Sequence, residues 1–252
     1  MKWRDCLGTL GAWTAFACTV ACFDPVLRVS SLFGSESLDR MVARLGKCLT
    51  YSIDAGLCHL DLQGLDNVPN RKGVIVVGNH QSLVESFVPL YQLRALSPRY
   101  VAKEVLGRCF LPSISFVLRR GGHCLIDRQN HDQAIEAITK LGEAVNRGEI
   151  SAIIFPEGTR SLEGNLQHFR TGGLRTLLQT APQAPVMVMV VHNGNKIYPK
   201  GLPHVTAGTK ISMRFLPLIE RASFSDNEQL IEHVHNLMVD NYRSLEESDR
   251  QN

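Results

Sequence analysis

Residues 151–161 read SAIIFPEGTRS and join an apolar half to a charged half. The apolar half is the short, uninterrupted run that is typical of a strand buried on both faces of a sheet. Pro156 ends this run, and a turn with a glutamate, a glycine and an arginine follows at once. Ligands of open α/β sheets bind at loops beyond the strand ends. The stretch therefore predicts a buried strand that leads into a polar site.

Similar apolar runs occur on both sides of this stretch. Further strands are expected at residues 73–80, 99–104, 123–128, 184–194 and 210–219. Helical patterns lie between them at about 132–146 and 172–180, and a closing helix is expected at about 226–245. Short apolar strands that alternate with helices indicate an α/β fold. We expect a mostly buried mixed sheet flanked by helices.

The composition excludes several classes of protein. With 252 residues, of which 44% are hydrophobic and 20% charged, the chain can bury a sizeable core and is not a disordered protein. The net charge of +3 is mild, and no dense basic run with interleaved aromatic residues suggests a nucleic-acid partner. The 7 cysteines are odd in number and form no CxxC motif, which favours reduced thiols over a disulfide framework or a metal site.

The run NHQSLVE, residues 79–85, follows the expected strand at 73–80 and carries a histidine and a glutamate. On one regular helix His80 and Glu85 would point roughly 140° apart. They can meet only if His80 precedes the helix and Glu85 lies in its first turns. A carboxylate on one imidazole nitrogen would then make the other a general base. The alternative is a structural histidine at a helix start that Asn79 or Ser82 caps.

The turn FPEGTRS, residues 155–161, carries groups that suit a phosphate. Gly158 lets the backbone approach a ligand closely, and the planar fork of Arg160 matches phosphate oxygens. Glu157 can accept hydrogen bonds from a polyol or orient an arginine. Arg128, after the strand expected at 123–128, is a second candidate phosphate ligand. The alternatives are a turn with a surface salt bridge and a solvated arginine.

Taken together, NHQSLVE, GGHCLIDR, FPEGTRS and APVMVMV resemble the four motifs of the glycerolipid acyltransferases, in the same order. The resemblance covers roughly residues 60–220 and is closest to the 1-acylglycerol-3-phosphate acyltransferase type. It implies the fold of that family and an acyl transfer without cofactor or metal. It also implies a thioester co-substrate, either acyl-ACP or acyl-CoA.

Carried over by position, the resemblance implies that His80 is the catalytic base and that Glu85 orients it. Glu85 stands where the family usually has an aspartate, so the pair is a variant. Ser115 stands in place of a common glycine, and Val188 in place of a second proline. The positions implied to bind the acceptor's glycerol phosphate, or to support its site, are Lys103, Arg128, Glu157, Gly158, Thr159 and Arg160.

The first 58 residues have a different pattern. Residues 7–23 carry no charge, and a helix of this length extends roughly 25 Å, slightly less than the ~30 Å hydrocarbon core of a bilayer. Apolar residues then recur at steps of three and four from Leu38 to Leu57, which predicts an amphipathic helix capped by Ser35 or Ser37. We expect two helices separated at Asp24-Pro25 that associate with a membrane.

Other interpretations of the first segment are a signal peptide, a lipoprotein signal ending at Cys22, and a buried core helix. A retained anchor is favoured because acyl thioesters are cytosolic. The expected organisation is a membrane-associating segment at 1–58, an α/β acyltransferase domain at 59–245 and a frayed tail at 246–252. The expected location is the cytoplasmic face of the inner membrane.

The leading hypothesis is transfer of an acyl chain to the free hydroxyl of 1-acylglycerol-3-phosphate, which forms phosphatidic acid for phospholipid synthesis. The expected partners are the bilayer, the lysolipid acceptor and acyl carrier protein or a CoA thioester, without nucleic acid. One alternative keeps the chemistry but uses another lysolipid, such as a lysophospholipid or an amino-acid-containing lysolipid. A catalytically silent membrane-binding module and a secreted hydrolase are the others.

Overall fold

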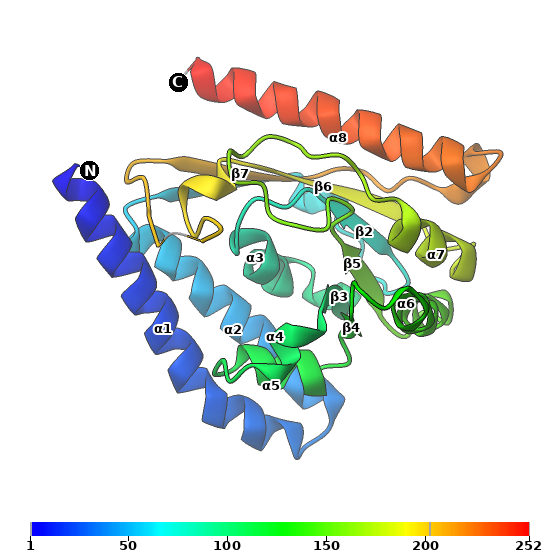
Figure 1. Ribbon diagram of the computed structural model, residues 1–252, viewed down its shortest axis with the longest axis horizontal. Coiled ribbons are helices and arrows are strands. Elements are labelled where there is room, and N and C mark those ends of the chain that lie inside the picture. The colour runs from blue at the N-terminus through cyan, green and yellow to red at the C-terminus, as the bar shows by residue number, and fades with distance from the viewer. Residues whose placement is uncertain (1, 202, 252) are drawn as a thin grey trace.

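The computed structural model describes residues 2–201 and 203–251 and places seven strands in one sheet (Figure 1). The strand order is β1-β7-β6-β2-β5-β3-β4. Neighbouring strands are parallel, except that β6 and β7 are antiparallel. The expected mixed α/β sheet is therefore confirmed. The strands are β1 His59–Gln63, β2 Ile75–Gly78, β3 Pro98–Lys103, β4 Cys124–Ile126, β5 Ser151–Ile154, β6 Val186–His192 and β7 Lys210–Phe215.

Helices cover both faces of the sheet (Figure 1). On one face lie α1 Trp3–Ser31, α2 Ser35–Ala55 and α3 Val84–Gln92, and on the other lie α6 His131–Asn146, α7 Gly172–Thr180 and α8 Asn227–Arg250. Two short helices, α4 Glu104–Arg108 and α5 Ile114–Arg120, follow β3. Single 3-10 turns occupy η1 Leu65–Asn67, η2 Arg94–Leu96, η3 Gly194–Lys196 and η4 Arg221–Ser223.

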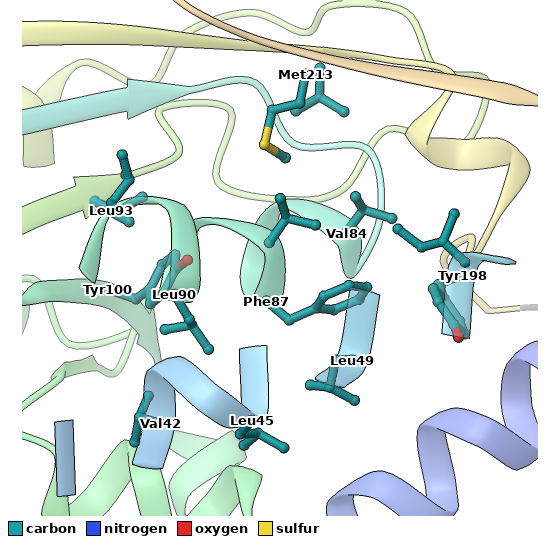
Figure 2. Packing of buried hydrophobic residues seen from close by; sticks show 14 of the residues in the cluster. Val42, Leu45, Leu49, Val84, Phe87, Leu90, Leu93, Tyr100, Tyr198 and Met213 are labelled. Atoms are coloured by element: carbon teal, nitrogen blue, oxygen red, sulfur yellow. The ribbon is translucent and has the colours of Figure 1, made fainter. Parts of the chain in front are cut away.

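Each face of the sheet has its own hydrophobic cluster. Along β2, Val76 belongs to the cluster of α1, α2 and α3, whereas Ile75 and Val77 belong to that of α6, α7 and α8. This alternation follows from the two-residue period of a strand, and it explains why the central strands are apolar throughout. Figure 2 shows part of the first cluster, where Val42, Leu45 and Leu49 of α2 face Phe87 and Leu90 of α3.

The parallel register brings the polar strand ends together. Val77 of β2 pairs with Ile154 of β5 and with Val188 of β6, so the carboxyl ends of the three strands lie at one edge. Asn79 extends β2 because its side chain donates to the carbonyl of Val191 and accepts from the amide of the same residue. The loop that carries His80 is thereby held at the edge where the 155–161 turn begins.

The N-terminal helices differ from the expectation at their boundary. The predicted break at Asp24-Pro25 is wrong, because α1 continues through it to Ser31. The carboxylate of Asp24 bonds the guanidinium of Arg28 one turn later, which supports the helix across the proline. The chain turns instead at Gly34, whose φ of 94° lies in the left-handed region that favours glycine. Gly34 rather than a serine is the N-cap of α2.

The sequence pattern also missed one strand and the length of the last helix. Helix α2 ends at Ala55, and β1 follows and pairs with β7. Leu60 and Leu62 alternate as in a strand, but β1 is short and directly follows a run with helical spacing. Helix α8 continues to Arg250, beyond the expected end at about Leu245. The division into segments 1–58, 59–245 and 246–252 stays a prediction.

Candidate active site

The structure brings His80 and Glu85 together. Helix α3 begins at Val84, so His80 lies in the preceding loop and Glu85 in the first turn. The Nδ1 atom of His80 lies 2.8 Å from Oε1 of Glu85. This is the arrangement that the spacing requires for the two side chains to meet. It leaves Nε2 as the ring nitrogen that is free to act on a ligand.

Glu85 lies inside the protein among hydrogen-bond donors. Its side chain is completely buried, and Oε1 accepts hydrogen bonds from the backbone amides of Gln81, at 2.5 Å, and Ser82, at 2.6 Å. The hydroxyl of Ser82 donates to Oε2 at 3.0 Å. Donors on both oxygens offset the cost of burying a carboxylate. They also fix its position against the imidazole.

The imidazole of His80 is fixed from a second side. The ring of Phe155 stacks on it at a centroid distance of 4.5 Å and an interplanar angle of 13°. The backbone carbonyl of His80 accepts from the amide of Ser161 at 2.8 Å. The residues on either side of Pro156 therefore position the histidine, and the apolar end of the 151–161 stretch contributes directly to the site.

Glu157 is turned inward. Its side chain is buried, and Oε1 accepts from the backbone amide of His80 at 3.3 Å. Oε2 has no hydrogen-bond partner among the described residues. Burial, with repulsion from Glu85, raises the pKa of Glu157 to about 8. The carboxyl thus contacts the loop that carries His80. It does not orient any arginine of the described residues, as one of the two interpretations of Glu157 has it.

The raised pKa of Glu157 makes protein stability depend on pH. The unfolded chain releases this proton near pH 4.5 and the folded chain near pH 8, so the folded state binds more protons between these values. The contribution to the free energy of unfolding is full below pH 4.5 and falls as pH rises towards 8. Glu157→Gln should remove this fall. Urea unfolding, followed by tryptophan fluorescence at several pH values, measures the free energy of unfolding of both proteins. If that free energy changes equally with pH in the parent protein and in Glu157→Gln, the raised pKa does not belong to Glu157.

Basic side chains gather at the Gly158–Thr159 turn. Gly158 has a φ of 71°, and its carbonyl accepts from the guanidinium of Arg128. Nζ of Lys200 donates to the hydroxyl of Thr159 at 2.9 Å. The pKa of Lys103 is lowered first by the charge of Arg128, then by burial, and further by Lys200 and Arg160. Lys103 thus lies within electrostatic range of the other three cations.

Arg160 lies within electrostatic range of Glu85, the partner of His80. Burial lowers its pKa, whereas the negative charge of Glu85 opposes that shift. Arg170 also contributes, because burial and then the charge of Arg170 lower the pKa of Arg128. Among residues 2–201 and 203–251, none of these basic side chains forms a salt bridge. We call them the cation cluster: Lys103, Arg128, Arg160, Arg170 and Lys200.

Sequence reasoning did not single out Lys200 or Arg170. Arg170 lies between the turn at 155–161 and α7, outside the four motifs. Lys200 follows η3 in a turn with a proline and a glycine, and nothing in its local sequence distinguishes it from a solvated lysine. Lys200 reaches the hydroxyl of Thr159 only because the chain turns back towards the site after β6.

Comparison with known proteins places these residues in a family. A family model described as Acyltransferase matches residues 59–193, just over half of the chain. The chain belongs to the acyltransferase family. The match contains His80, Glu85, Lys103, Arg128 and the turn at 157–160, and it ends before Lys200. The family membership that the motifs predict is therefore confirmed.

Individual relatives agree with this assignment. A 1-acyl-sn-glycerol-3-phosphate acyltransferase of Cocos nucifera is 30% identical over 168 residues, which are 66% of this chain and 53% of that protein. The protein of that name from Borreliella burgdorferi is 26% identical over 72% of this chain and 70% of its own length. The match thus spans about half the length of the coconut protein.

A solved structure supports the fold of this acyltransferase. The crystal structure of the 1-acyl-sn-glycerophosphate acyltransferase PlsC from Thermotoga maritima superposes with a TM-score of 0.80. The superposition covers 96% of each chain, at 22% sequence identity. The likeness includes nearly the whole chain, and so extends beyond the residues that the family model matches.

Proposed function

We propose that this chain is an O-acyltransferase that moves a fatty acyl chain from a thioester to the free hydroxyl of 1-acylglycerol-3-phosphate. The observation that carries the proposal is the pairing of His80 with Glu85 beside a cation cluster that has no acidic partner among the described residues. The pair supplies a base for a hydroxyl, and the cluster supplies charge for a phosphate. The names of the relatives support the same acceptor.

The reaction follows from the roles of these groups. The acceptor hydroxyl attacks the thioester carbonyl while Nε2 of His80 takes its proton. The buried carboxylate of Glu85 stabilises the imidazolium that forms. When the tetrahedral intermediate collapses, the carbon–sulfur bond breaks and the thiolate leaves with the proton from His80. The new ester and the free thiol account for all atoms, and no enzyme nucleophile is required.

The cation cluster gives the acceptor its orientation. Arg128 and Arg160 present planar donors to phosphate oxygens, and Lys103 adds a third charge. Binding the phosphate at this turn holds the glycerol hydroxyl near the imidazole, which converts a bimolecular encounter into an oriented one. The donor is proposed to be acyl-ACP or acyl-CoA.

Replacing Arg160 by alanine tests the acceptor. The loss of one charge-assisted contact to phosphate should raise the KM for 1-acylglycerol-3-phosphate by about 10–100-fold. The KM for monoacylglycerol, which has no phosphate, should hardly change. Arg175→Ala is the matched control, because Arg175 lies on α7 and pairs with Glu228.

The assay measures thiol release with a panel of lysolipids, with acyl-ACP and acyl-CoA as separate donors. An equal rise in KM for both acceptors would show that Arg160 does not recognise phosphate. Faster turnover of a lysophospholipid with a larger head group than of 1-acylglycerol-3-phosphate would instead favour the alternative acceptor class.

We further propose that α1 lies in one leaflet rather than crossing the bilayer. By length and composition α1 could span a membrane, with a mean hydropathy of 1.6 in its most apolar window. However, it is tied to the body along its length. The hydroxyl of Thr9 accepts from the amide of Val205, the carbonyl of Ala12 accepts from Tyr198, and that of Val20 accepts from Ser113. A perpendicular span would break these bonds.

The outer face of α1 is apolar and suits an interfacial position. The side chains of Trp3, Leu7, Leu10, Val26 and Val29 are exposed. Such a face can bury itself at the boundary of head groups and acyl chains while the body stays in water. Because both thioester donors are made in the cytosol, we place the protein at the cytoplasmic face of the membrane.

A further inference from the structure

A second exposed apolar group lies outside α1. Residues 104–112 comprise α4 and the segment before α5, and we call them the 104–112 loop. Its exposed side chains include Phe110, at 87%, Val105, at 55%, and Leu111, at 41%. Contiguous exposed apolar residues mark interaction sites. The acyl-transfer chemistry does not use these side chains.

The loop is attached to the C-terminal half of α1. Ser113, at its end, donates from its backbone amide to Asp24 at 2.6 Å and from its hydroxyl to the carbonyl of Val20 at 2.5 Å. Ser113 is completely buried. Figure 1 shows α5 next to this half of α1, with α4 packed on α5. The loop therefore lies beside the half of α1 that carries the exposed Val26 and Val29.

The loop bonds its own backbone internally. The hydroxyl of Ser115 accepts from the amide of Leu111 and lies within hydrogen-bond distance of the carbonyls of Leu106 and Cys109. The guanidinium of Arg119 donates to the carbonyl of Gly107 at 2.9 Å. Backbone groups that enter lipid must be satisfied within the protein, because the hydrocarbon offers no partner. This segment meets that requirement at several of its peptide groups while its apolar side chains point outward.

Basic side chains lie near these apolar ones. Arg28 and Arg108 pair with Asp24 and Glu104 respectively. Arg119 and Arg120 are exposed at the end of α5, and neither forms a salt bridge within residues 2–201 and 203–251. Exposed apolar side chains beside arginines that have no acidic partner among the described residues match an anionic leaflet. The apolar side chains would enter its acyl chains, and the arginines would bind its head groups.

We propose that the 104–112 loop inserts Phe110 and Leu111 into the leaflet that holds α1, with anionic head groups bound at Arg119 and Arg120. The inference rests on the membrane association of the proposed function and adds a second contact to it. Strand β3 ends at Lys103, so the loop begins directly after a member of the cation cluster. A lysolipid would thus leave the bilayer beside the groups that bind its phosphate.

Vesicle binding tests the contribution of the loop. Phe110→Ser combined with Leu111→Ser should lower partitioning onto vesicles that contain phosphatidylglycerol by about tenfold or more, because two apolar side chains no longer enter lipid. Ile135→Ser is the matched control, since Ile135 is an exposed apolar residue on α6, on the opposite face of the sheet. Equal binding of the double variant and the control would overturn the proposal.

A depth measurement gives an independent result. The 2 tryptophans of the chain, Trp3 and Trp13, both lie in α1. Replacing both by phenylalanine and introducing Phe110→Trp gives a single reporter in the loop. Lipids brominated on the acyl chain should quench it in vesicles with phosphatidylglycerol. If Trp3 of the unaltered protein is quenched but the reporter at position 110 is not, the loop does not insert, although α1 does.

The two proposals can fail separately. Thiol release with a short-chain, water-soluble lysophosphatidic acid requires no membrane, and the double loop variant should retain it within about twofold. Absence of thiol release by the unaltered protein with this acceptor would contradict the proposed function and leave the vesicle result standing. Arg120→Ala leaves the bond from Arg119 to the carbonyl of Gly107 in place. It should weaken binding to phosphatidylglycerol vesicles only, and an equal loss on pure phosphatidylcholine would overturn the head-group assignment.

Discussion

Replacing His80 by alanine should lower kcat for thiol release in the presence of lysolipid by about 10²–10⁴-fold, the usual contribution of a general base. Nε2 of His80 is the basic atom that the pairing with Glu85 leaves free. Without it, water must remove the proton of the acceptor hydroxyl. The KM for the acceptor should change little, because the proposed phosphate contacts come from the cation cluster.

The fold should survive this substitution. Glu85 retains its hydrogen bonds from Gln81 and Ser82 when the imidazole is removed, so its carboxylate stays satisfied. Circular dichroism and thermal unfolding compare the variant with the parent protein. His131→Ala is the control, because His131 is exposed at the start of α6. Thiol release by His80→Ala at the parent rate would exclude His80 as the base.

Local patterns were sufficient to predict the central sheet and the meeting of His80 with Glu85. The apolar runs of β2, β5 and β6 can only be buried, and parallel strands bring their carboxyl ends to one edge. The His80–Glu85 spacing restricts contact to one arrangement, with the helix starting between them. The structure has this arrangement, since α3 begins at Val84.

Features that depend on tertiary contacts were not predictable from the sequence. The inward turn of Glu157 depends on the backbone of His80, and the role of Lys200 depends on the path of the chain after β6. Val188, a departure from the family's pattern, packs in the cluster of α6, α7 and α8, and Ser115 bonds within the 104–112 loop region. Neither substitution alters the contacts of His80.

The strongest test of the variant carboxylate is Glu85→Asp, which should lower kcat by about 10²-fold although the resemblance implies an aspartate at this position. Shortening the side chain by one methylene withdraws the carboxylate by more than about 1 Å from Nδ1 of His80, and a displacement of that size costs about 10²-fold in rate. The carboxylate cannot follow freely, because the amides of Gln81 and Ser82 are placed for glutamate.

Glu85→Gln separates the effect of the negative charge from the effect of side-chain length, because it keeps the length and removes the charge. An amide nitrogen cannot accept, so at least one donor among His80, Gln81 and Ser82 loses its partner, and the imidazolium loses its counter-charge. We expect kcat to fall by about 10²–10⁴-fold with the KM for the acceptor nearly unchanged. Glu143→Asp on α6 is the control for the shorter side chain. Parent turnover in Glu85→Asp would mean that residues 79–84 adjust to either carboxylate, whereas parent turnover in Glu85→Gln would remove Glu85 from the mechanism.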